Sequence, residues 1–433
     1  MSATNRRIRE STTQRSISPD KQLRRLVLAN MLFEDQFYLD GISNYELLKV
    51  LVAKADPKVV QNLAIEARTK FKLRHVPLAI ARELARTRNL PADVLAEIIQ
   101  RPDEMGEFVS LYWKDGKQPL SNQVKKGLAK AFHKFNEYQL AKWNKDSAVV
   151  KLRDVMFMTH VKPKTPEQEA LFKRVAENTL TTPDTWEVAL SGGADKAETF
   201  IRLMEEKKLG ALAFLRNLRN MTQSGIPVSY ITEYAKNLDV SKVLPFRFIA
   251  AARIVPNPKI VEMLEEMMFR ALKSMPKLPG KTVLLVDVSG SMFGFKISGK
   301  SDLDRFDAAA ALAILCRELC ESVEIYSFSA TAVRVRNTRG FDLVKAISDS
   351  QYHGGTRLGV SMEQVNGLTS YDRVVVFTDE QSSDRPRAPK NDVPGYIVNV
   401  AAYKDGINNG SWLAVDGFSE AVFDYIREIE ADF

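Results

Sequence analysis

Residues 281–291 read KTVLLVDVSGS, a run of β-branched and leucine residues that ends in a polar cluster. Such a run predicts a buried strand. Further runs of this kind follow, with helical periodicity between most of them: SVEIYSFSA (322–330), TAVRVRN (331–337), RVVVFTDE (373–380) and YIVNVAAY (396–403). Strands that alternate with helices predict βαβ units, so we expect an α/β domain with a mostly parallel sheet.

Polar residues cluster where the predicted strands end. Asp287, Ser289 and Ser291 follow the first strand, Thr356 follows two glycines, and Asp379 ends a later strand. Ligands of parallel sheets bind beyond the carboxyl ends of the strands. Five oxygen donors without His or Cys suit a hard divalent cation, Mg²⁺ first, with Ca²⁺ and Mn²⁺ as alternatives. Ser and Asp are also common in turns after strands, so the joint occurrence carries this prediction.

Catalytic interpretations of the same residues do not fit. A phosphatase with an aspartyl nucleophile needs a second Asp two positions on, where Ser289 stands. Residues 288–292 lack the flanking glycines of a Gly-x-Ser-x-Gly nucleophile elbow, and no phosphate-binding Gly-x-x-x-x-Gly-Lys-Ser/Thr follows a predicted strand. We therefore expect no catalytic residues and a protein that is not an enzyme.

The part of the chain before the strands has a helical pattern. From residue 21 to residue 275, apolar residues recur at i, i+3, i+4 and i+7 between short Pro, Gly or Asp interruptions. About a dozen helices are too many for one bundle and predict an α-solenoid of divergent helix pairs. We expect a disordered basic tail over residues 1–20, helical repeats over residues 21–275 and the α/β domain over residues 276–433.

The net charge of +8 is divided unevenly along the chain. Residues 1–275 hold 45 Lys and Arg against 32 Asp and Glu, a net charge of +13, whereas residues 276–433 hold 17 against 22, a net charge of −5. A basic half predicts a polyanionic partner for that half.

The compartment follows from what the sequence lacks. No stretch approaches the roughly 18 apolar residues of a membrane span, and the basic N-terminus has no apolar run behind it. The only cysteines, Cys316 and Cys320, cannot build a disulfide scaffold or a four-cysteine zinc site. We expect no membrane partner and a reducing compartment, the cytoplasm.

Basic and aromatic residues gather around a helix that we expect over residues 123–143. Lys126, Lys130 and Lys134 follow one another at i, i+4 and i+8, although like charges at this spacing destabilise a helix. The stripe is either a solvated face or a phosphate contact, and lysines near aromatic residues suit RNA with unpaired bases. Arginines near helix ends could bind RNA or complement the helix dipole. The further candidates are Lys142, Lys145, Lys162, Arg86, Arg88, Arg216 and Arg219.

Three motifs of the α/β half resemble the metal-ion-dependent adhesion site of von Willebrand factor A domains. They are LLVDVSGSM (284–292), HGGT (353–356) and VVVFTDE (374–380). The resemblance covers about residues 280–433 and implies that the five oxygen residues named above hold the cation. It also implies that an open coordination position accepts a carboxylate from an acidic protein ligand, so the domain would dock a partner.

Four motifs of the helical half resemble, in order, the TROVE module of the Ro autoantigen family. They are FEDQFYLDG (33–41), LRDVMFMTHVKPK (152–164), LAFLRNLRNMT (212–222) and VLPFRFIAAAR (243–253). The resemblance implies HEAT-like repeats closed into a ring and joined to the von Willebrand factor A domain. It also implies RNA contacts at or near Lys126, Lys130, Lys142, Lys145, His160 and Lys162.

The function implied by this second resemblance is RNA binding. The partners would be small noncoding Y-like RNA and single-stranded ends of misfolded RNA, in noncoding-RNA stability, processing or quality control, with an exoribonuclease in some bacterial members. We expect a monomer. The alternative is a protein-interaction scaffold with a peptide-binding solenoid and a metal site for an acidic partner. A peptide-binding solenoid has no need for a net charge of +13, so the charge favours RNA.

Overall fold

The computed structural model describes residues 18–29, 42–241, 243–273, 275–297, 303–390, 393–401, 412–416 and 421–431. The motif FEDQFYLDG and residues 1–17 of the predicted tail lie outside the described residues. The chain forms two compact units, of which the first ends at Gly192 and the second continues from Gly193. Among the helices that can be described, none is both long and apolar enough to cross a membrane.

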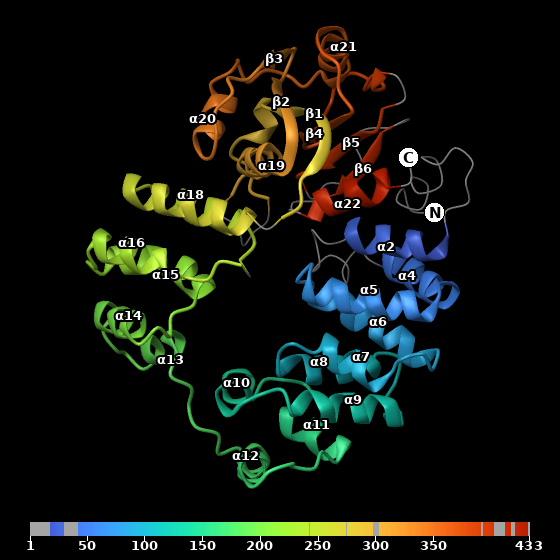
Figure 1. Cartoon of the computed structure of the whole chain (residues 1–433), viewed down its shortest axis with the longest axis vertical. Coiled ribbons are helices and arrows are strands. Elements are labelled where there is room, and N and C mark those ends of the chain that lie inside the picture. Colours follow the sequence, from blue (N-terminus) through green and yellow to red (C-terminus); the bar gives the residue numbers. More distant parts are fainter. Residues whose placement is uncertain are drawn as a thin grey trace. The chain divides into compact units, whose positions relative to one another are not determined.

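The first unit is built from helices. They are α2 (Pro19–Ala29), α4 (Ile42–Lys54), α5 (Pro57–Thr69), α6 (His75–Arg86), α7 (Ala92–Ile98), α8 (Asp103–Tyr112), α9 (Asn122–Phe132), α10 (Glu137–Trp143), α11 (Leu152–Thr159), α12 (Pro166–Glu177) and α13 (Trp186–Ser191). Most pack on the next helix but one, with α4 on α6, α6 on α8, α5 on α7 and α7 on α9. Figure 1 shows the resulting stack. The predicted α-solenoid is confirmed, whereas closure into a ring stays a prediction.

The single helix expected over residues 123–143 is wrong, because the structure has two helices there. Helix α9 ends at Phe132, and α10 begins after Asn136, whose side chain accepts a 2.9 Å hydrogen bond from the Gln139 N–H in a capping box. Phe135, between the two helices, is buried. The apolar spacing therefore continues across the break and hides it from a periodicity argument.

Gly106 of α8 lets the segment after α10 lie directly against that helix. A methyl group at Gly106 would lie 2.3 Å from the carbonyl oxygen of Val150, closer than real Cβ contacts. We therefore expect Gly106→Ala to lower the free energy of unfolding by about 1–3 kcal/mol, measured by urea denaturation. Gly192→Ala is the control, because its nearest atoms would lie at an ordinary 3.4 Å. Equal stability of the two variants would show that the segment moves aside without cost.

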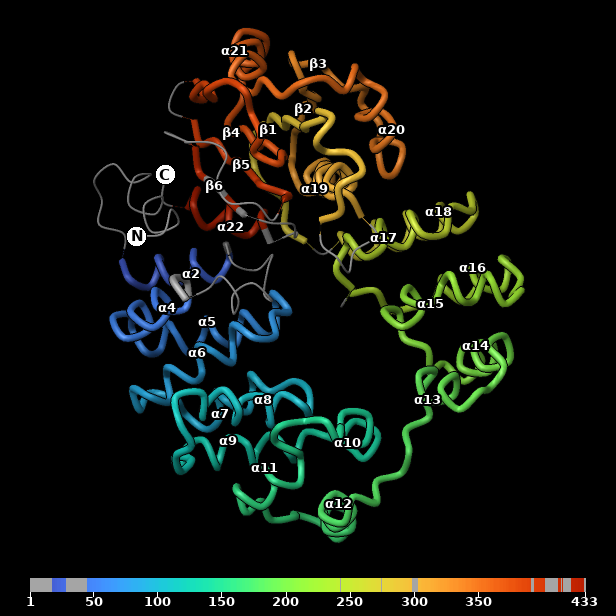
Figure 2. The backbone as a smooth tube through the Cα atoms, turned by 180° about the vertical axis from the view of Figure 1, so that it is seen from behind, coloured from blue at the N-terminus to red at the C-terminus, as the bar shows by residue number. Residues whose placement is uncertain are grey.

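The second unit joins further helices to one sheet. Its helices are α14 (Lys196–Glu205), α15 (Ala211–Gln223), α16 (Val228–Lys236), α17 (Phe246–Ile254), α18 (Pro258–Leu272), α19 (Arg305–Leu319), α20 (Asp342–Ser348), α21 (Leu358–Leu368) and α22 (Ala421–Glu430), with a short 3₁₀ helix at Gly290–Met292. Its strands are β1 (Leu278–Asp287), β2 (Cys320–Phe328), β3 (Ala332–Arg334), β4 (Arg373–Thr378), β5 (Gly395–Asn399) and β6 (Leu413–Asp416). Figure 2 shows these elements from behind.

The sheet has the strand order β3-β2-β1-β4-β5-β6. Every neighbouring pair is parallel except β2 and β3, which are antiparallel. The predicted α/β domain with a mostly parallel sheet is confirmed, and each strand segment expected from the sequence is present. Strand β6 was not among them, because its four residues are too short to stand out as an apolar run.

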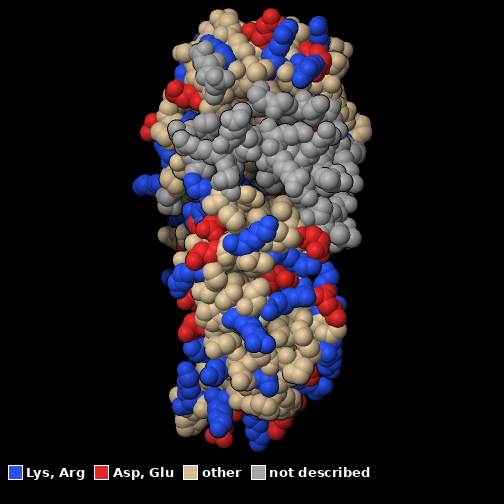
Figure 3. Space-filling view, turned by 90° about the vertical axis from the view of Figure 1, so that its right-hand side faces the viewer, with Lys and Arg blue, Asp and Glu red and all other residues tan. Residues whose placement is uncertain are grey.

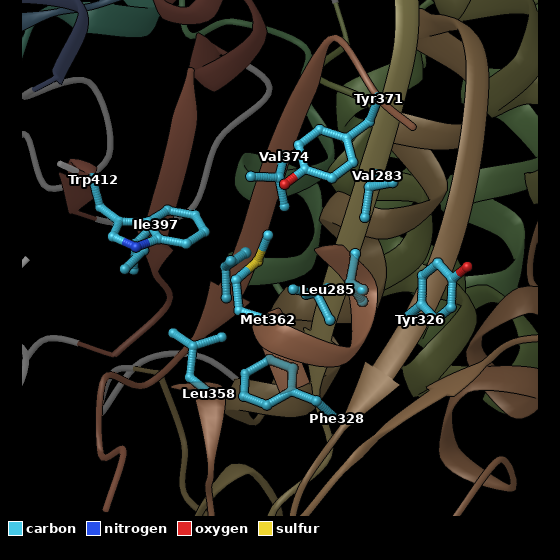
Figure 4. Close-up of a cluster of buried hydrophobic side chains, with 12 residues drawn as sticks. Val283, Leu285, Tyr326, Phe328, Leu358, Met362, Tyr371, Val374, Ile397 and Trp412 are labelled. Carbon is cyan, nitrogen blue, oxygen red and sulfur yellow. The ribbon is translucent and has the colours of Figure 1, made fainter. Parts of the chain in front are cut away.

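Helices cover both faces of this sheet. Val283 and Leu285 of β1 pack with Leu358 and Met362 of α21 on one face, as Figure 4 shows. Successive strand residues point to opposite faces. Arg373 therefore points away from α21, and it binds Glu430 of α22 through two hydrogen bonds of 2.6 and 2.7 Å. Helix α19 contacts β1, β2 and β4. Because helices cover both faces of the sheet, polar side chains gather at its carboxyl edge instead.

Candidate functional site

The predicted metal ligands come together at the carboxyl edge of the sheet. The carboxylate of Asp287 accepts a 2.9 Å hydrogen bond from the Ser289 N–H and a 2.6 Å hydrogen bond from the Thr378 hydroxyl. The hydroxyl oxygens of Ser289 and Ser291 lie 3.2 Å apart. Thr378 belongs to the polar cluster at the end of β4 but was not among the five predicted ligands.

A backbone hydrogen bond and the order of the strands bring the other two loops to this point. The Gly290 N–H donates a 3.1 Å hydrogen bond to the carbonyl of Gly354, so the loop that ends at Thr356 lies beside the first loop. Asp379 follows β4, the neighbour of β1, and its side chain is fully buried. Asp287, Ser289, Ser291 and Asp379 are therefore brought together, and the loop that carries Thr356 lies beside them.

Burial governs the ionisation of Asp287. Loss of water around this fully buried side chain raises the pKa of its carboxyl to about 6, and the negative charge of Asp379 acts in the same direction. The hydrogen bonds from Thr378 and Ser289 oppose that rise. A cation beside Asp287 would favour its ionised form, which the fold alone disfavours.

A guanidinium also reaches this site. Arg305, at the start of α19, donates a 2.7 Å hydrogen bond to Oδ2 of Asp379 and a 3.2 Å hydrogen bond to the carbonyl of Ser291. Both partners of this ion pair are buried, with side chains 5% and 0% exposed. Arg305 lies in none of the quoted motifs, so the sequence analysis did not identify it. Its positive charge already neutralises one of the two carboxylates.

The oxygen set fits a hard cation, with one condition. Among the residues that the structure describes, no three His, Cys, Asp or Glu side chains gather into a metal cluster, so a cation here would depend on hydroxyl oxygens. Carboxylate and hydroxyl oxygens with added water suit Mg²⁺. Asp379 could contact such an ion only if its carboxylate bound the ion and Arg305 together, or if its hydrogen bond with Arg305 broke.

Aromatic side chains surround the same loops. Phe293 stacks on His353 with ring centroids 4.2 Å apart and on Phe306 at 4.6 Å. Phe295 is 55% exposed and Tyr352 is 88% exposed. Large exposed apolar groups beside a polar site are typical of a surface that binds a partner.

Some of the predicted RNA-binding residues are engaged within the first unit. Lys134 donates two hydrogen bonds, of 2.7 and 2.5 Å, to the carbonyls of Ala96 and Ile99 at the end of α7, and burial lowers its pKa. Lys130 forms a 2.5 Å ion pair with Asp93. The Arg86 guanidinium pairs with Asp115. The lysine stripe is therefore not one continuous surface.

The remaining candidates differ from these three residues. Seven candidates form no ion pair with any residue in the described part of the chain. They are Lys126, Lys142, Lys145, Lys162, Arg88, Arg216 and Arg219. Lys142 lies 5.9 Å from the ring centroid of Tyr138, and Lys145 lies 5.5 Å from that of Trp143. Cations without a carboxylate partner are available to bind phosphate.

Helix α11 adds an aromatic residue to this basic region. Arg153, Phe157 and His160 are exposed and recur at i, i+4 and i+7, and the Phe157 side chain is 57% exposed. His160 follows the helix in a left-handed conformation with φ 51°. Phe157 was missed in the sequence, although its helical spacing from His160 could have pointed to it.

Charge of both signs is spread over the helical surface. Figure 3 shows Lys and Arg interspersed with Asp and Glu on the face that it presents, without a single large basic patch. Net charge alone therefore does not mark the binding surface on this face. The unpaired cations are a more specific criterion.

The fold and these sites define a class of protein, in which α-helical repeats are combined with an α/β domain bearing an oxygen-lined site. Residues 177–262 match the family model described as TROVE domain. The chain is similar in structure to the Deinococcus radiodurans RO (RSR) protein, with a TM-score of 0.65 and 18% sequence identity over 87% of this chain and 92% of that chain. The resemblance to the TROVE-module Ro family is thereby confirmed.

Proposed function

We propose that the protein is an RNA-binding protein without enzymatic activity, acting as a cytoplasmic monomer in noncoding-RNA stability, processing or quality control. Its partners would be Y-like noncoding RNA and single-stranded RNA ends, with an exoribonuclease as a further partner. The observation that carries this proposal is two cations without an ion-pair partner beside aromatic rings, Lys142 beside the exposed Tyr138 and Lys145 beside Trp143. Basic residues with aromatic stacking partners are how proteins bind single-stranded RNA. The TROVE match and the net charge of +13 over residues 1–275 support the same conclusion.

We propose a second, separable activity for the α/β domain, the docking of an acidic protein ligand through a divalent cation. Mg²⁺ is the first choice, and Ca²⁺ and Mn²⁺ are alternatives. The convergence of Asp287, Ser289 and Ser291 supports the cation site. The exposed rings of Phe295 and Tyr352 at its rim support a partner surface.

The RNA proposal predicts a preference for free single-stranded ends. If the helical repeats close into a ring, as the family resemblance implies, its central hole would admit a single strand but not a duplex. We expect a hairpin with a single-stranded 3′ tail to bind at least about tenfold more tightly than the same hairpin with a blunt end. Competition gel-shift assays with tailed, blunt and circularised forms of one RNA measure this ratio.

Each outcome of this competition is informative. Charge alone would favour the duplex, because its phosphate density is higher than that of a single strand. Equal binding of all three RNAs would contradict the ring and leave an open basic surface. Tight binding of the circular form at the level of the tailed form would mean that single-strandedness, and not a free end, is recognised.

A further inference from the structure

The first unit contains a cavity that the sequence analysis did not predict, although one predicted residue, Lys145, lies in its wall. It has a volume of about 520 Å³ and lies between α8 and the segment from Trp143 to Leu152. Its walls are mostly apolar, with Leu111, Val150 and Leu152 among them. Small-molecule pockets have volumes of roughly 300–1,000 Å³ and apolar walls with a few polar groups. The cavity is therefore large enough for one planar heterocycle.

An indole ring forms part of the wall and is held in place. The guanidinium carbon of Arg101 lies 3.6 Å from the centroid of the Trp143 ring, and Nε of Arg101 donates a 3.0 Å hydrogen bond to Asp103. Trp143 lines the cavity, whereas Arg101 does not. A preorganised aromatic ring costs little conformational entropy when a second ring stacks on it.

The wall also contains a carboxylate with an unused hydrogen-bond position. Oε1 of Glu107 accepts a hydrogen bond from Arg74. Oε2 of Glu107 is buried and has no hydrogen-bond partner among the described residues. Burial raises the pKa of this carboxyl above its ordinary value. A small rotation of the carboxyl group would present Oε2 to a donor in the cavity, and a ligand N–H would relieve the cost of its burial.

Positive charge is present at the same cavity. Lys114 and Lys145 both line it, and no ion pair of either side chain occurs within the described part of the chain. An aromatic amino acid of a peptide would fill the apolar space but would bring no phosphate. An unpaired nucleotide offers a flat ring, N–H groups on its edge and a phosphate, which together match the ring, the carboxylate and the lysines.

We infer that this cavity binds one unpaired nucleotide of single-stranded RNA, with its base beside Trp143, a base N–H on Glu107 and its phosphate near Lys145. The inference rests on the proposed RNA binding and assigns to it a base-recognising subsite. Guanine is the preferred base, because its N1–H and its amino group lie on one edge, so that one can donate to Oε2 and the other to the second lone pair of Oε1.

Calorimetric titration with the four ribonucleoside 5′-monophosphates and with inorganic phosphate tests this inference on the full chain. We expect guanosine monophosphate to bind most tightly and phosphate alone to bind at least about tenfold more weakly. Trp143→Leu should weaken nucleotide binding by about tenfold, the loss typical of one stacking partner. Trp186→Leu is the matched control, because Trp186 lies in α13 of the same unit and outside the cavity. Trp143→Phe keeps an aromatic ring at this position and should therefore retain most of the nucleotide affinity that Trp143→Leu loses.

Glu107→Gln tests base recognition separately. It keeps the size of the side chain and should reduce the preference for guanosine over uridine monophosphate severalfold, with phosphate binding unchanged. Absence of nucleotide binding, or equal affinity for all four nucleotides and for a capped phenylalanine peptide, would overturn the inference. If guanosine monophosphate does not bind while tailed RNA still does, RNA binding stands and the cavity is not its subsite. Nucleotide binding without any RNA binding would instead contradict the proposed function.

Discussion

Replacing Lys142, Lys145 and Lys162 by glutamine is expected to weaken binding of a 3′-tailed RNA by about 100-fold at 0.1 M salt. Each phosphate contact on a single strand releases about 0.7 counterion, which is worth about fivefold in affinity at this concentration. The slope of log affinity against log salt should become shallower by about 2. Filter binding at several salt concentrations measures both quantities.

The matched control removes the same charge from lysines that have a carboxylate neighbour. Lys49, Lys173 and Lys236 pair with Glu46, Glu177 and Glu233, respectively, within one helical turn. Their replacement by glutamine should change RNA affinity by less than about threefold, through net charge alone. If both triple variants lose the same affinity, binding depends on overall charge and the proposed contacts are wrong. Lys134 is left out of both sets because it holds the end of α7.

Addition of Mg²⁺ is expected to raise the melting temperature of the α/β domain, and Asp287→Asn is expected to remove that effect. A ligand at 100 times its dissociation constant stabilises the folded state by about 2.7 kcal/mol. For a domain of this size the shift is about 5–10 °C. Differential scanning calorimetry in Mg²⁺ and in chelator measures it, with the exposed Asp342→Asn as the control. RNA affinity should be unchanged, because the cations proposed to bind RNA lie in other helices.

The response of Arg305→Met separates a metal site from a self-contained ion pair. Loss of the Arg305 guanidinium leaves the buried Asp379 carboxylate without its ion-pair partner. This should destabilise the metal-free domain by about 3–5 kcal/mol. If the cation and Arg305 share Asp379, the stabilisation by Mg²⁺ should be larger in this variant than in the wild type. A melting temperature that neither Mg²⁺ nor chelator changes in either protein would show that no cation binds at the site. Hydrolysis of a phosphate ester that Asp287→Asn abolishes would contradict the absence of enzymatic activity.

Element type was predictable from the sequence because it depends on local periodicity. The apolar run at 281–291 became the central strand β1, and the helical spacing of the first half became the stacked helices. Helix ends were less predictable. A capping box at Asn136 interrupts an apolar pattern that continues through buried Phe135, so side-chain hydrogen bonds and not periodicity set the break.

The sequence by itself determined the two architectures and the meeting of Asp287, Ser289 and Ser291 with Asp379, because strand ends of a parallel sheet meet at one edge whatever the details of packing. Only the tertiary structure decided which charges are available. Arg305 reaches Asp379 across 74 positions, and Lys130 and Lys134 are occupied by α7, whereas Lys142 and Lys145 are not. The cavity beside Trp143 likewise joins α8 to a segment some 40 positions later. Partners distant in sequence leave no periodic signal, since their contact depends on how helices and strands pack and not on local spacing.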